Sequence, residues 1–199
     1  MSVPNSIDIA GLILAGGRAT RMGGRDKAEI ELAGQTLLAR TVARARPQVG
    51  RLLLNANRDP AQFARYGLPV LPDTIGDHWG PLAGILAGLE HLRESWPHIT
   101  WLASFPTDSP FFPESLVARL AEALPGRELA MASSRGRLEP VFALWPVSLA
   151  GELRGALAGG VRKVEDFARR YRLATIDFPS DAFFNVNTPE DLMLAAKRL

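Results

Sequence analysis

The sequence predicts a single-domain α/β fold: a mostly parallel, twisted sheet with helices on both faces and one antiparallel strand near an edge. Short apolar runs alternate with segments of helical periodicity, which is the pattern of repeated strand–helix units. The length of 199 residues suits one domain, and the chain shows no internal repeat, low-complexity tract or linker. Polar residues follow several of the apolar runs, as they do where strands end at a ligand site.

The expected strands are short apolar or extended segments. In chain order they are 9–15, 28–32, 52–54, 70–71, 99–105, 128–133, 140–145, 173–176 and 183–187. The run 52–54 is too short and too closely flanked to be a helix. The polar, basic loop 134–139 is short enough for a hairpin, so it predicts the antiparallel pairing that large α/β sheets often contain.

Capping residues and periodicity predict the helices. These are expected at 36–46, 60–66, 81–96, 113–124, 146–157, 161–170 and from 188 onward. Thr36 can cap the first helix, which Pro47 stops. The segment after Gly80 shows the clearest pattern, with leucine and isoleucine at helical spacing behind Pro81 in the first turn. Thr188, followed by a proline and two acids, predicts the start of the last helix.

Composition limits the classes of protein to which the chain can belong. It is 47% hydrophobic and 22% charged, which is typical of a soluble globular protein. The absence of cysteine excludes disulfides, thiolate zinc sites and a cysteine nucleophile. No apolar stretch approaches the roughly 18 residues of a membrane span, and residues 1–15 do not have the shape of a signal peptide. The net charge of +2 is small and scattered, so we expect a cytoplasmic protein with no nucleic-acid or membrane partner.

The most informative stretch lies directly after the first expected strand. Residues 12–27 read LILAGGRATRMGGRDK and contain four glycines, three arginines and one lysine. Glycine lets the backbone approach a ligand closely, and arginine and lysine bind phosphate oxygens. The stretch lacks the Gly-Lys-Ser/Thr of a P-loop and the Gly-x-Gly-x-x-Gly of a dinucleotide site. It therefore indicates a triphosphate cradle of another kind, with a solvated strand-to-helix turn as the alternative.

Polar side chains that could join this cradle follow the next three strands. Asn55 and Asn57 follow the second strand, Asp73 the third and Asp108 the fourth. Because ligands of open α/β sheets bind beyond the carboxyl ends of the strands, these residues predict one site. Asp108 is the best candidate ligand for Mg²⁺, which prefers carboxylate and phosphate oxygens, although it could instead cap the following helix. Asp73 could bind a nucleoside or provide a second metal position, or merely form a turn. Asn55 could likewise bind a nucleoside or merely end a strand.

The remaining polar residues give weaker signals. The three histidines have no spacing typical of metal ligands, and Ser133 and Ser134 lack the Gly-x-Ser-x-Gly setting of a hydrolase. Two basic pairs are typical of solvated charge and could, in this fold, also bind an anionic second substrate. These pairs are Arg135 with Arg137 and Arg162 with Lys163.

Several motifs in a fixed order give the chain a specific resemblance. They are the loop 14–27, NANR at 55–58, PD at 72–73, GPLAG at 80–84, PTDSP at 106–110, EPVFAL at 139–144 and NVNTPE at 185–190. The set covers most of the chain and resembles the molybdenum cofactor guanylyltransferases, members of the nucleotide-diphospho-sugar transferase-like group with its Rossmann-like fold. The glycine pairs 16–17 and 23–24 resemble the guanylyl branch rather than the cytidylyl relatives. Thr107 departs from the family, which often has a smaller or sulfur-containing residue there.

The resemblance implies transfer of GMP from GTP to the terminal phosphate of molybdenum-bound molybdopterin, with release of pyrophosphate. It implies that GTP binds to Leu14, Ala15, Gly16, Gly17, Lys27, Asn55, Asp73 and Asp108. Mg²⁺ would bind at Asp108, and molybdopterin near Arg162, Lys163, Asn185 and Asn187. Within the single domain, residues 1–112 would bind GTP and residues 113–199 molybdopterin. A pterin-delivering protein and apo-molybdoenzymes or their chaperones could be further partners.

The implied chemistry agrees with the residue types present. The acceptor supplies its own nucleophile, a phosphate oxygen, so the protein needs to position two anions and neutralise their charge. Arg21, Lys27 and Asp108 are the candidate catalytic residues. Two alternatives stay open: a nucleotidylyltransferase that uses CTP or a sugar or polyol phosphate, and a non-catalytic cofactor carrier. The presence of all three candidate residues disfavours the carrier.

Overall fold

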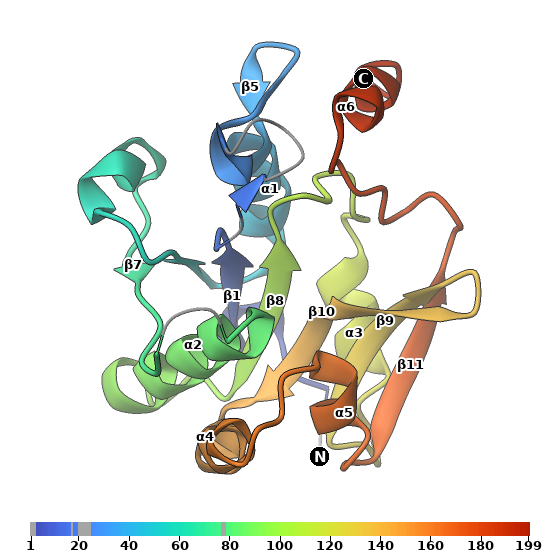
Figure 1. The fold of residues 1–199 in the computed structure, drawn as a ribbon. Coiled ribbons are helices and arrows are strands. Elements are labelled where there is room, and N and C mark those ends of the chain that lie inside the picture. Colours follow the sequence, from blue (N-terminus) through green and yellow to red (C-terminus); the bar gives the residue numbers. More distant parts are fainter. Residues whose placement is uncertain (1–2, 17, 20–24, 77–78) are drawn as a thin grey trace.

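The computed structural model describes residues 3–16, 18–19, 25–76 and 79–199. In this part of the chain a seven-stranded sheet has the order β11-β9-β10-β8-β1-β6-β7 (Figure 1). Its strands are β1 (Ile9–Leu14), β6 (Arg51–Asn55), β7 (Val70–Leu71), β8 (Trp101–Pro106), β9 (Leu129–Ser134), β10 (Arg137–Pro146) and β11 (Leu173–Phe178). β10 is antiparallel to both neighbours and the other strands are parallel, which confirms the predicted sheet. The antiparallel strand lies third from the β11 edge.

Smaller elements surround this sheet. Two short antiparallel ladders are β2 (Arg18–Ala19) with β3 (Arg25–Asp26) and β4 (Glu31–Leu32) with β5 (Gln35–Thr36). The α-helices are α1 (Leu37–Ala45), α2 (Pro81–Ser95), α3 (Leu116–Glu122), α4 (Ala150–Ala158), α5 (Val164–Ala168) and α6 (Pro189–Ala196). The 3₁₀ segments are η1 (Ser6–Asp8), η3 (Lys27–Glu29), η4 (Arg46–Gln48), η5 (Pro60–Tyr66) and η6 (Val147–Leu149). None of the helices in the described ranges is long and apolar enough to cross a membrane.

Four predicted segments differ from the structure. The segment 28–32, expected to be extended, begins in the 3₁₀ segment η3 and is a strand only at β4. The helix expected over 161–170 is limited to α5, because Lys163 has an extended backbone with ψ of 133°. The helix expected from 113 begins only at Leu116. The segment 183–187 was expected to be extended and belongs to no strand of the described sheet.

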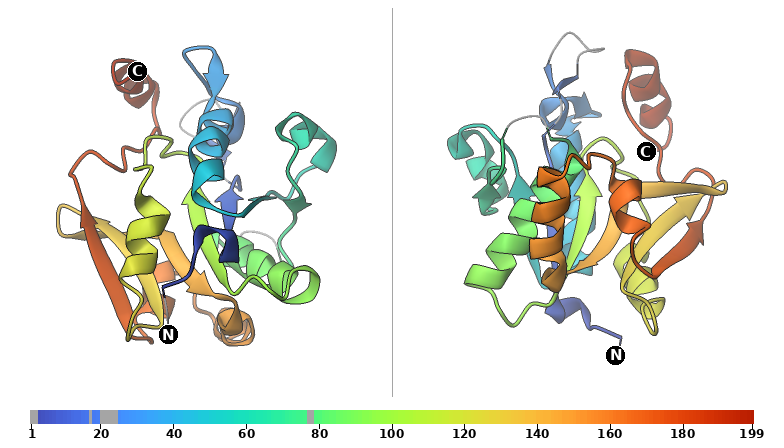
Figure 2. Two further views of the ribbon diagram at one scale, coloured as in Figure 1. Left: turned by 180° about the vertical axis from the view of Figure 1, so that it is seen from behind. Right: turned by 60° about the horizontal axis from the view of Figure 1, so that its bottom comes forward.

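Helices cover both faces of the sheet, as the sequence predicts. α2, α4 and α5 lie on one face, and α1 and α3 lie on the other (Figure 1 and Figure 2). Alternate residues of β1 enter opposite cores: Ile9 and Ile13 pack on the α1 and α3 side, whereas Ala10 and Leu12 pack on the α2 side. A strand that is buried on both faces must be apolar at nearly every position, which is why the runs were readable from the sequence.

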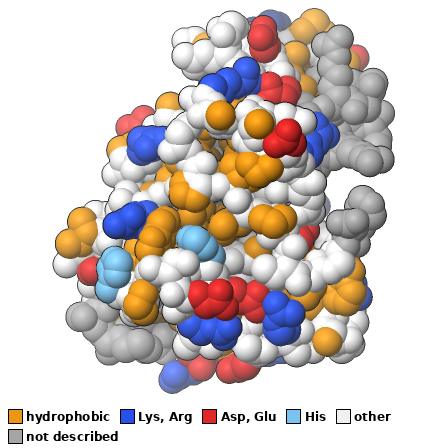
Figure 3. Space-filling model, turned by 90° about the vertical axis from the view of Figure 1, so that its left-hand side faces the viewer, with side chains coloured by type: hydrophobic (Ala, Val, Ile, Leu, Met, Phe, Trp, Pro, Cys, Tyr) orange, Lys and Arg blue, Asp and Glu red, His pale blue; other side chains and the backbone are white. Residues whose placement is uncertain are grey.

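The side of the molecule near β7 and η5 presents a mixed surface. Figure 3 shows hydrophobic side chains there among charged side chains of both signs.

A large irregularity interrupts the pairing of β10 with β9. Glu139 pairs with Ala132, but the next pair joins Ala143 to Met131, so residues 140–142 have no partner in β9. Proline at 140 has no N–H to donate to a ladder, which favours a bulge at this point. The hydroxyl of Ser104 donates to the Val141 carbonyl at 2.5 Å, which satisfies one polar group of the bulge. The bulge lies near the edge of the sheet at which the parallel strands end.

The hairpin beyond the bulge closes with a two-residue turn. Arg135 and Gly136 have φ angles of 53° and 70°, respectively, which is the requirement of a type I′ turn. Such a turn matches the twist of the two strands and projects the basic tip of the hairpin past the sheet edge.

A complete capping box fixes the start of α6. The Thr188 hydroxyl accepts the Asp191 N–H at 3.1 Å, and the Asp191 Oδ2 atom accepts the N–H groups of Thr188 at 2.9 Å and Asn187 at 3.0 Å. Hydrogen bonds from these backbone groups lower the pKa of Asp191, the bond from Asn187 most strongly. The cap therefore orders the backbone of Asn187 as well as the helix.

We expect Asp191→Ala to lower the free energy of unfolding by about 1 kcal/mol at pH 7, because the N–H groups at 187 and 188 lose their acceptor. The pKa of Asp191 is lowered in the folded state, so its contribution is complete above the unfolded pKa of about 4 and is lost as the pH falls through the folded pKa. In urea unfolding, the difference in the free energy of unfolding between the variant and the parent should be smaller at pH 3 than at pH 7. Glu190→Ala, at an exposed position in the same turn, is the control; a loss at pH 3 as large as at pH 7 would contradict the cap.

Candidate active site

A cleft of about 730 Å³ lies at the carboxyl ends of the parallel strands. It is lined by Leu14, Ala15, Gly16, Lys27, Asn55, Asn57, Arg58, Asp73, Gly80, Pro81, Pro106, Thr107, Asp108 and Val141. The sequence predicted this gathering, because β1, β6, β7 and β8 all end at one edge. Of the predicted site residues, Gly17 and Arg21 lie outside the described part of the chain.

Lys27 joins two distant parts of the chain. Its Nζ atom donates to Asp108 Oδ2 at 3.0 Å and to Asn187 Oδ1 at 2.5 Å. The side chains of Lys27 and Asp108 are 22% and 25% exposed, so the ammonium and carboxylate remain accessible to a ligand. The predicted phosphate-binding lysine, the predicted metal ligand and one predicted acceptor residue therefore meet at one point.

The polar ends of β6 and β7 form a hydrogen-bonded triad. Asn55 Nδ2 donates to Asp73 Oδ1 at 2.9 Å, and Asn57 Nδ2 donates to Asp73 Oδ2 at 2.8 Å. The backbone N–H of Asp73 in turn donates to Asn57 Oδ1 at 2.7 Å. The two amides fix the orientation of the carboxylate, which still has lone pairs for the N–H or O–H groups of a nucleoside.

The end of β8 is tied to its neighbours on both sides. Thr107 Oγ1 donates to the Leu14 carbonyl at 2.9 Å, which links the end of β8 to the start of the glycine-rich loop. The Val186 N–H donates to the Asp108 carbonyl at 2.7 Å, and the Ser109 hydroxyl is hydrogen-bonded to Asn185 Oδ1. The departure at Thr107 thus supplies a structural hydrogen bond, and the segment 185–187 is held against Asp108.

The four predicted acceptor residues fall in two places. Asn185 and Asn187 lie beside Asp108, whereas Arg162 and Lys163 lie between α4 and α5 and line neither described cavity. The Arg162 guanidinium stacks 3.8 Å from the ring centroid of Trp79, next to Gly80 of the cleft. The structure therefore brings the two asparagines next to Lys27 and Ser109, whereas Arg162 stays outside the lining of the cleft.

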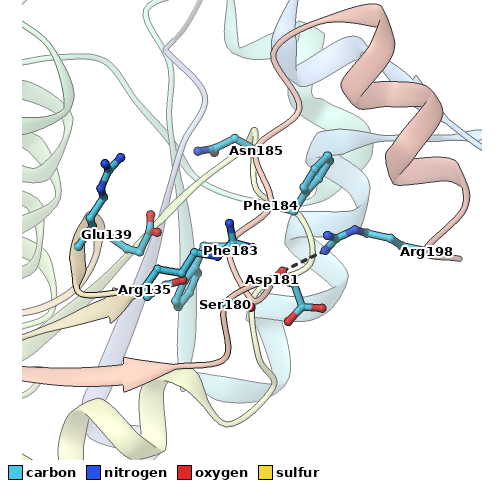
Figure 4. A pocket seen from close by; sticks show the side chains of 10 residues that line it. Arg135, Glu139, Ser180, Asp181, Phe183, Phe184, Asn185 and Arg198 are labelled. Atoms are coloured by element: carbon cyan, nitrogen blue, oxygen red, sulfur yellow. Dashed lines mark hydrogen bonds between the residues drawn. The ribbon is translucent and has the colours of Figure 1, made fainter.

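A second cavity of about 590 Å³ adjoins Asn185 (Figure 4). It is lined by Ser134, Arg135, Arg137, Glu139, Ser180, Asp181, Phe183, Phe184, Asn185 and Arg198. Its residues come from the β9–β10 hairpin, the segment 180–185 and the end of the chain. The two cavities lie on either side of the bulge, since Glu139 lines one and Val141 lines the other.

Sequence reasoning missed an ion-pair network that supports the Asp73 loop. Arg154 of α4 donates from Nε to Glu90 Oε1 at 2.7 Å and from Nη2 to Glu90 Oε2 at 2.8 Å, and the hydroxyl of Thr74 donates to Oε2 at 2.7 Å. Burial would raise the pKa of Glu90, but the hydrogen bonds from Arg154 and Thr74 outweigh it and the pKa is lowered. An acid at position 90 inside an apolar helix face was the available signal.

We expect Gly84→Ala to weaken nucleotide binding. Gly84 lies on α2, and a Cβ atom there would be 2.2 Å from Asn55 Oδ1 and 2.6 Å from Leu14 Cδ2. Asn55 must therefore move, and its hydrogen bond to Asp73 is broken. Loss of this charge-assisted bond leaves the Asp73 carboxylate less firmly oriented, so the KM for the nucleotide that the sequence predicts should rise about tenfold in steady-state assays.

Gly155→Ala on α4 is the matched control, because the added Cβ meets no atom within 4 Å. It should leave this KM unchanged and raise the free energy of unfolding by about 0.5–1 kcal/mol, as alanine is the better helix former. An unchanged KM in Gly84→Ala would remove Asn55 from the nucleotide site.

The donor atoms of the cleft fit a magnesium ion that is shared with a substrate. The described residues contain no group of three or more His, Asp or Glu side chains that could hold a metal by themselves. Mg²⁺ commonly takes one or two protein carboxylates and completes its shell with phosphate oxygens and water. Asp108 fits that role, since its Oδ1 atom accepts no hydrogen bond from a described residue and the cleft beside it is open.

Comparisons with known proteins identify the family of the chain. Residues 11–174 match the family described as MobA-like NTP transferase domain. A protein named molybdenum cofactor guanylyltransferase from Rhodopseudomonas palustris (strain BisB5) is 48% identical over 192 residues, which cover 94% of this chain and 91% of the relative.

Solved structures share the fold. Molybdopterin-guanine dinucleotide biosynthesis protein A from Archaeoglobus fulgidus has a TM-score of 0.74 at 24% identity, with 95% of this chain and 97% of that chain covered. The manganese complex of Rv0371C from Mycobacterium tuberculosis H37Rv has a TM-score of 0.69 at 17% identity, with coverage of 96% and 99%. The family match and the 48% identity, over nearly the full length, confirm the resemblance found in the sequence. The chain belongs to the MobA-like NTP transferase family, and the relatives to which it is similar over nearly its full length include molybdenum cofactor guanylyltransferases.

Proposed function

We propose that this chain transfers GMP from GTP to the terminal phosphate of molybdenum-bound molybdopterin and releases pyrophosphate. The observation that carries the proposal is the position of Lys27, whose ammonium contacts both Asp108 of the nucleotide cleft and Asn187 of the C-terminal part. A cation at this junction can neutralise phosphates that arrive from either side. The name of the relative from R. palustris supports the same reaction.

GTP is the proposed occupant of the larger cleft. The loop that begins with Leu14, Ala15 and Gly16 would offer backbone N–H groups to the triphosphate, with Gly17 and Arg21 completing the cradle. Asp73, oriented by Asn55 and Asn57, would accept hydrogen bonds from the nucleoside. This assignment gives the Asp73 carboxylate a ligand group of matching chemistry and gives Asn55 and Asn57 the task of orienting it.

Molybdopterin is the proposed ligand of the C-terminal side. Its terminal phosphate would lie at Lys27 and Asn187, and the rest of the molecule would extend past Asn185 into the second cavity. Arg135 and Arg137 line that cavity and supply the positive charge that an anionic acceptor requires. A contribution of Arg162 and Lys163 stays a prediction from the resemblance.

The proposed reaction is an in-line displacement. An acceptor phosphate oxygen forms a bond to the α-phosphorus of GTP, and the bond from that phosphorus to the pyrophosphate oxygen breaks. The protein holds two anions together against their repulsion, which is the task of Lys27 and the loop amides. Mg²⁺, when bound at Asp108, would supply Lewis-acid stabilisation of the charge on the phosphates. The M. tuberculosis protein of the same fold was solved with manganese, which supports a divalent cation but does not identify it.

Three further expectations stay predictions from the sequence. They are a cytoplasmic location, a protein that delivers the pterin, and transfer of the product to apo-molybdoenzymes or their chaperones. None of them changes the chemistry proposed for the site.

A nucleotide panel tests the proposal. Pyrophosphate release is measured from GTP, CTP and ATP with Mg²⁺, with and without molybdenum-bound molybdopterin. We expect release from GTP only, and only with the acceptor. Release from CTP would move the protein to the cytidylyl branch with the same mechanism, and GTP binding without release would favour a carrier.

A further inference from the structure

The second cavity contains a carboxylate to which the proposed reaction gives no task. Glu139 is half-buried and lines this cavity together with Arg135 and Arg137. Its carboxylate forms no hydrogen bond or ion pair with a described residue, and burial raises the pKa of this carboxyl group. A desolvated acid that lacks protein partners can be satisfied by a ligand that donates hydrogen bonds to it.

The position of Glu139 depends on the β10 bulge. Residues 140–142 leave the ladder directly after it, and Phe142 packs with Phe112 and Phe183 in the core. Glu139 therefore stands at the last regular pair of the hairpin, opposite Ala132. In Figure 4 its carboxyl group points toward the space between Asn185 and Phe183. The ladder thus fixes the backbone of Glu139, which lies in a strand and not in a loop.

The remaining walls suit a flat heterocycle. Phe184 offers an aromatic ring, against which the Arg198 guanidinium stacks at 4.3 Å from the ring centroid. The volume of about 590 Å³ lies within the range of small-molecule pockets. Aromatic rings, arginines and the half-buried carboxylate of Glu139 together match a planar ring system with a polar edge and an anionic tail.

We propose that Glu139 determines the specificity of the acceptor site by accepting two hydrogen bonds from the aminopyrimidinone edge of a pterin, its ring N–H and its exocyclic amino group. This inference rests on the proposed function and names the part of the acceptor that the second cavity binds. Asn185 lines the cavity and is hydrogen-bonded to Ser109, which follows Asp108 in the chain. A pterin ring in the cavity would therefore lie next to Asp108, with its phosphate close to Lys27.

Guanine carries the same donor edge, so the two substrates must be kept apart. In the nucleotide cleft Asp73 already accepts hydrogen bonds from Asn55 and Asn57, whereas Glu139 in the second cavity has no such partners. The test therefore needs a pterin without a nucleotide part and a competition with GTP.

The experiment measures fluorescence titration of the full chain with 6-hydroxymethylpterin and with 6-hydroxymethyllumazine, in which oxygen replaces the exocyclic amino group. We expect the parent to bind the pterin at least tenfold more tightly, because a carboxylate pairs with only one donor of the lumazine edge. Glu139→Gln should weaken pterin binding about tenfold and lose the preference, since its amide N–H faces a donor of the pterin. An excess of GTP and Mg²⁺ should not displace the probe.

Glu122→Gln is the matched control, because it makes the same change at an exposed position of α3 and Glu122 lines neither described cavity. Its pterin preference should equal that of the parent. Equal preference in the parent and Glu139→Gln would overturn the role of Glu139. Absence of pterin binding, or displacement by GTP, would overturn the assignment of the cavity. Neither result tests the proposed reaction itself, which is tested separately by pyrophosphate release with the complete acceptor.

Discussion

Lys27→Ala should lower kcat by about 10²–10³-fold, which is the scale for loss of one preorganised charge contact to a transition state. The Lys27 ammonium is the described group that contacts both sides of the site, at Asp108 and at Asn187. Its removal leaves the charges of the two substrates less neutralised where they must meet. Pyrophosphate release under saturating GTP and acceptor measures the effect.

The fold should survive this change. The ion pair of Lys27 with Asp108 is partly exposed, so its loss costs at most about 1 kcal/mol of stability. Lys197→Ala, at an exposed position after α6, is the matched control and should retain the parent rate. Lys27→Arg tests the role of charge apart from that of shape, because arginine keeps the positive charge but its guanidinium group is larger than an ammonium group. Parent kinetics in Lys27→Ala would remove Lys27 from the site.

Asp108→Asn should lower kcat by a comparable factor of about 10³, since metal stabilisation of phosphates supplies several kcal/mol. The asparagine is nearly isosteric and can still accept the hydrogen bond from Lys27 through Oδ1. The change therefore removes negative charge from the cleft while leaving its shape. We also expect the Mg²⁺ concentration for half-maximal rate to rise.

Asp166→Asn on the exposed side of α5 is the control for this measurement, and it should behave as the parent. A Mg²⁺ titration of the rate at fixed substrate distinguishes the two possible results. If Asp108→Asn kept both the parent rate and the parent Mg²⁺ dependence, Asp108 would not be the metal ligand.

The sequence predicted those parts of the fold that depend on local pattern. β1 and β8 are buried on both faces, so their apolar runs stand out, and the carboxyl ends of parallel strands bring Asn55, Asp73 and Asp108 to one cleft. Thr36 and Thr188 cap helices as expected, because caps depend on nearby residues. The helix predicted over 161–170 was too long, because Arg162 donates to the carbonyls of Leu157 and Val161 and the chain turns before α5 begins.

Contacts between distant residues could not be predicted in this way. The hydrogen bond from Lys27 to Asn187 joins positions 160 residues apart, and no local pattern specifies it. The pairing of Glu90 with Arg154 likewise depends on how α2 and α4 pack. The unpaired residues 140–142 follow from Pro140, but their number depends on how Phe142 fits among the rings of the core.

The hydrogen bond from Val186 to Asp108 has a consequence for the order in which the two sides of the site can form during synthesis. A ribosome makes the chain from its amino end, so the nucleotide cleft, built largely from residues 14–108, emerges well before the segment 185–187. Lys27 can meet Asp108 early, but it gains Asn187 only after the Val186 N–H has docked on the Asp108 carbonyl. A nascent chain could therefore hold a nucleotide before it could complete the acceptor side.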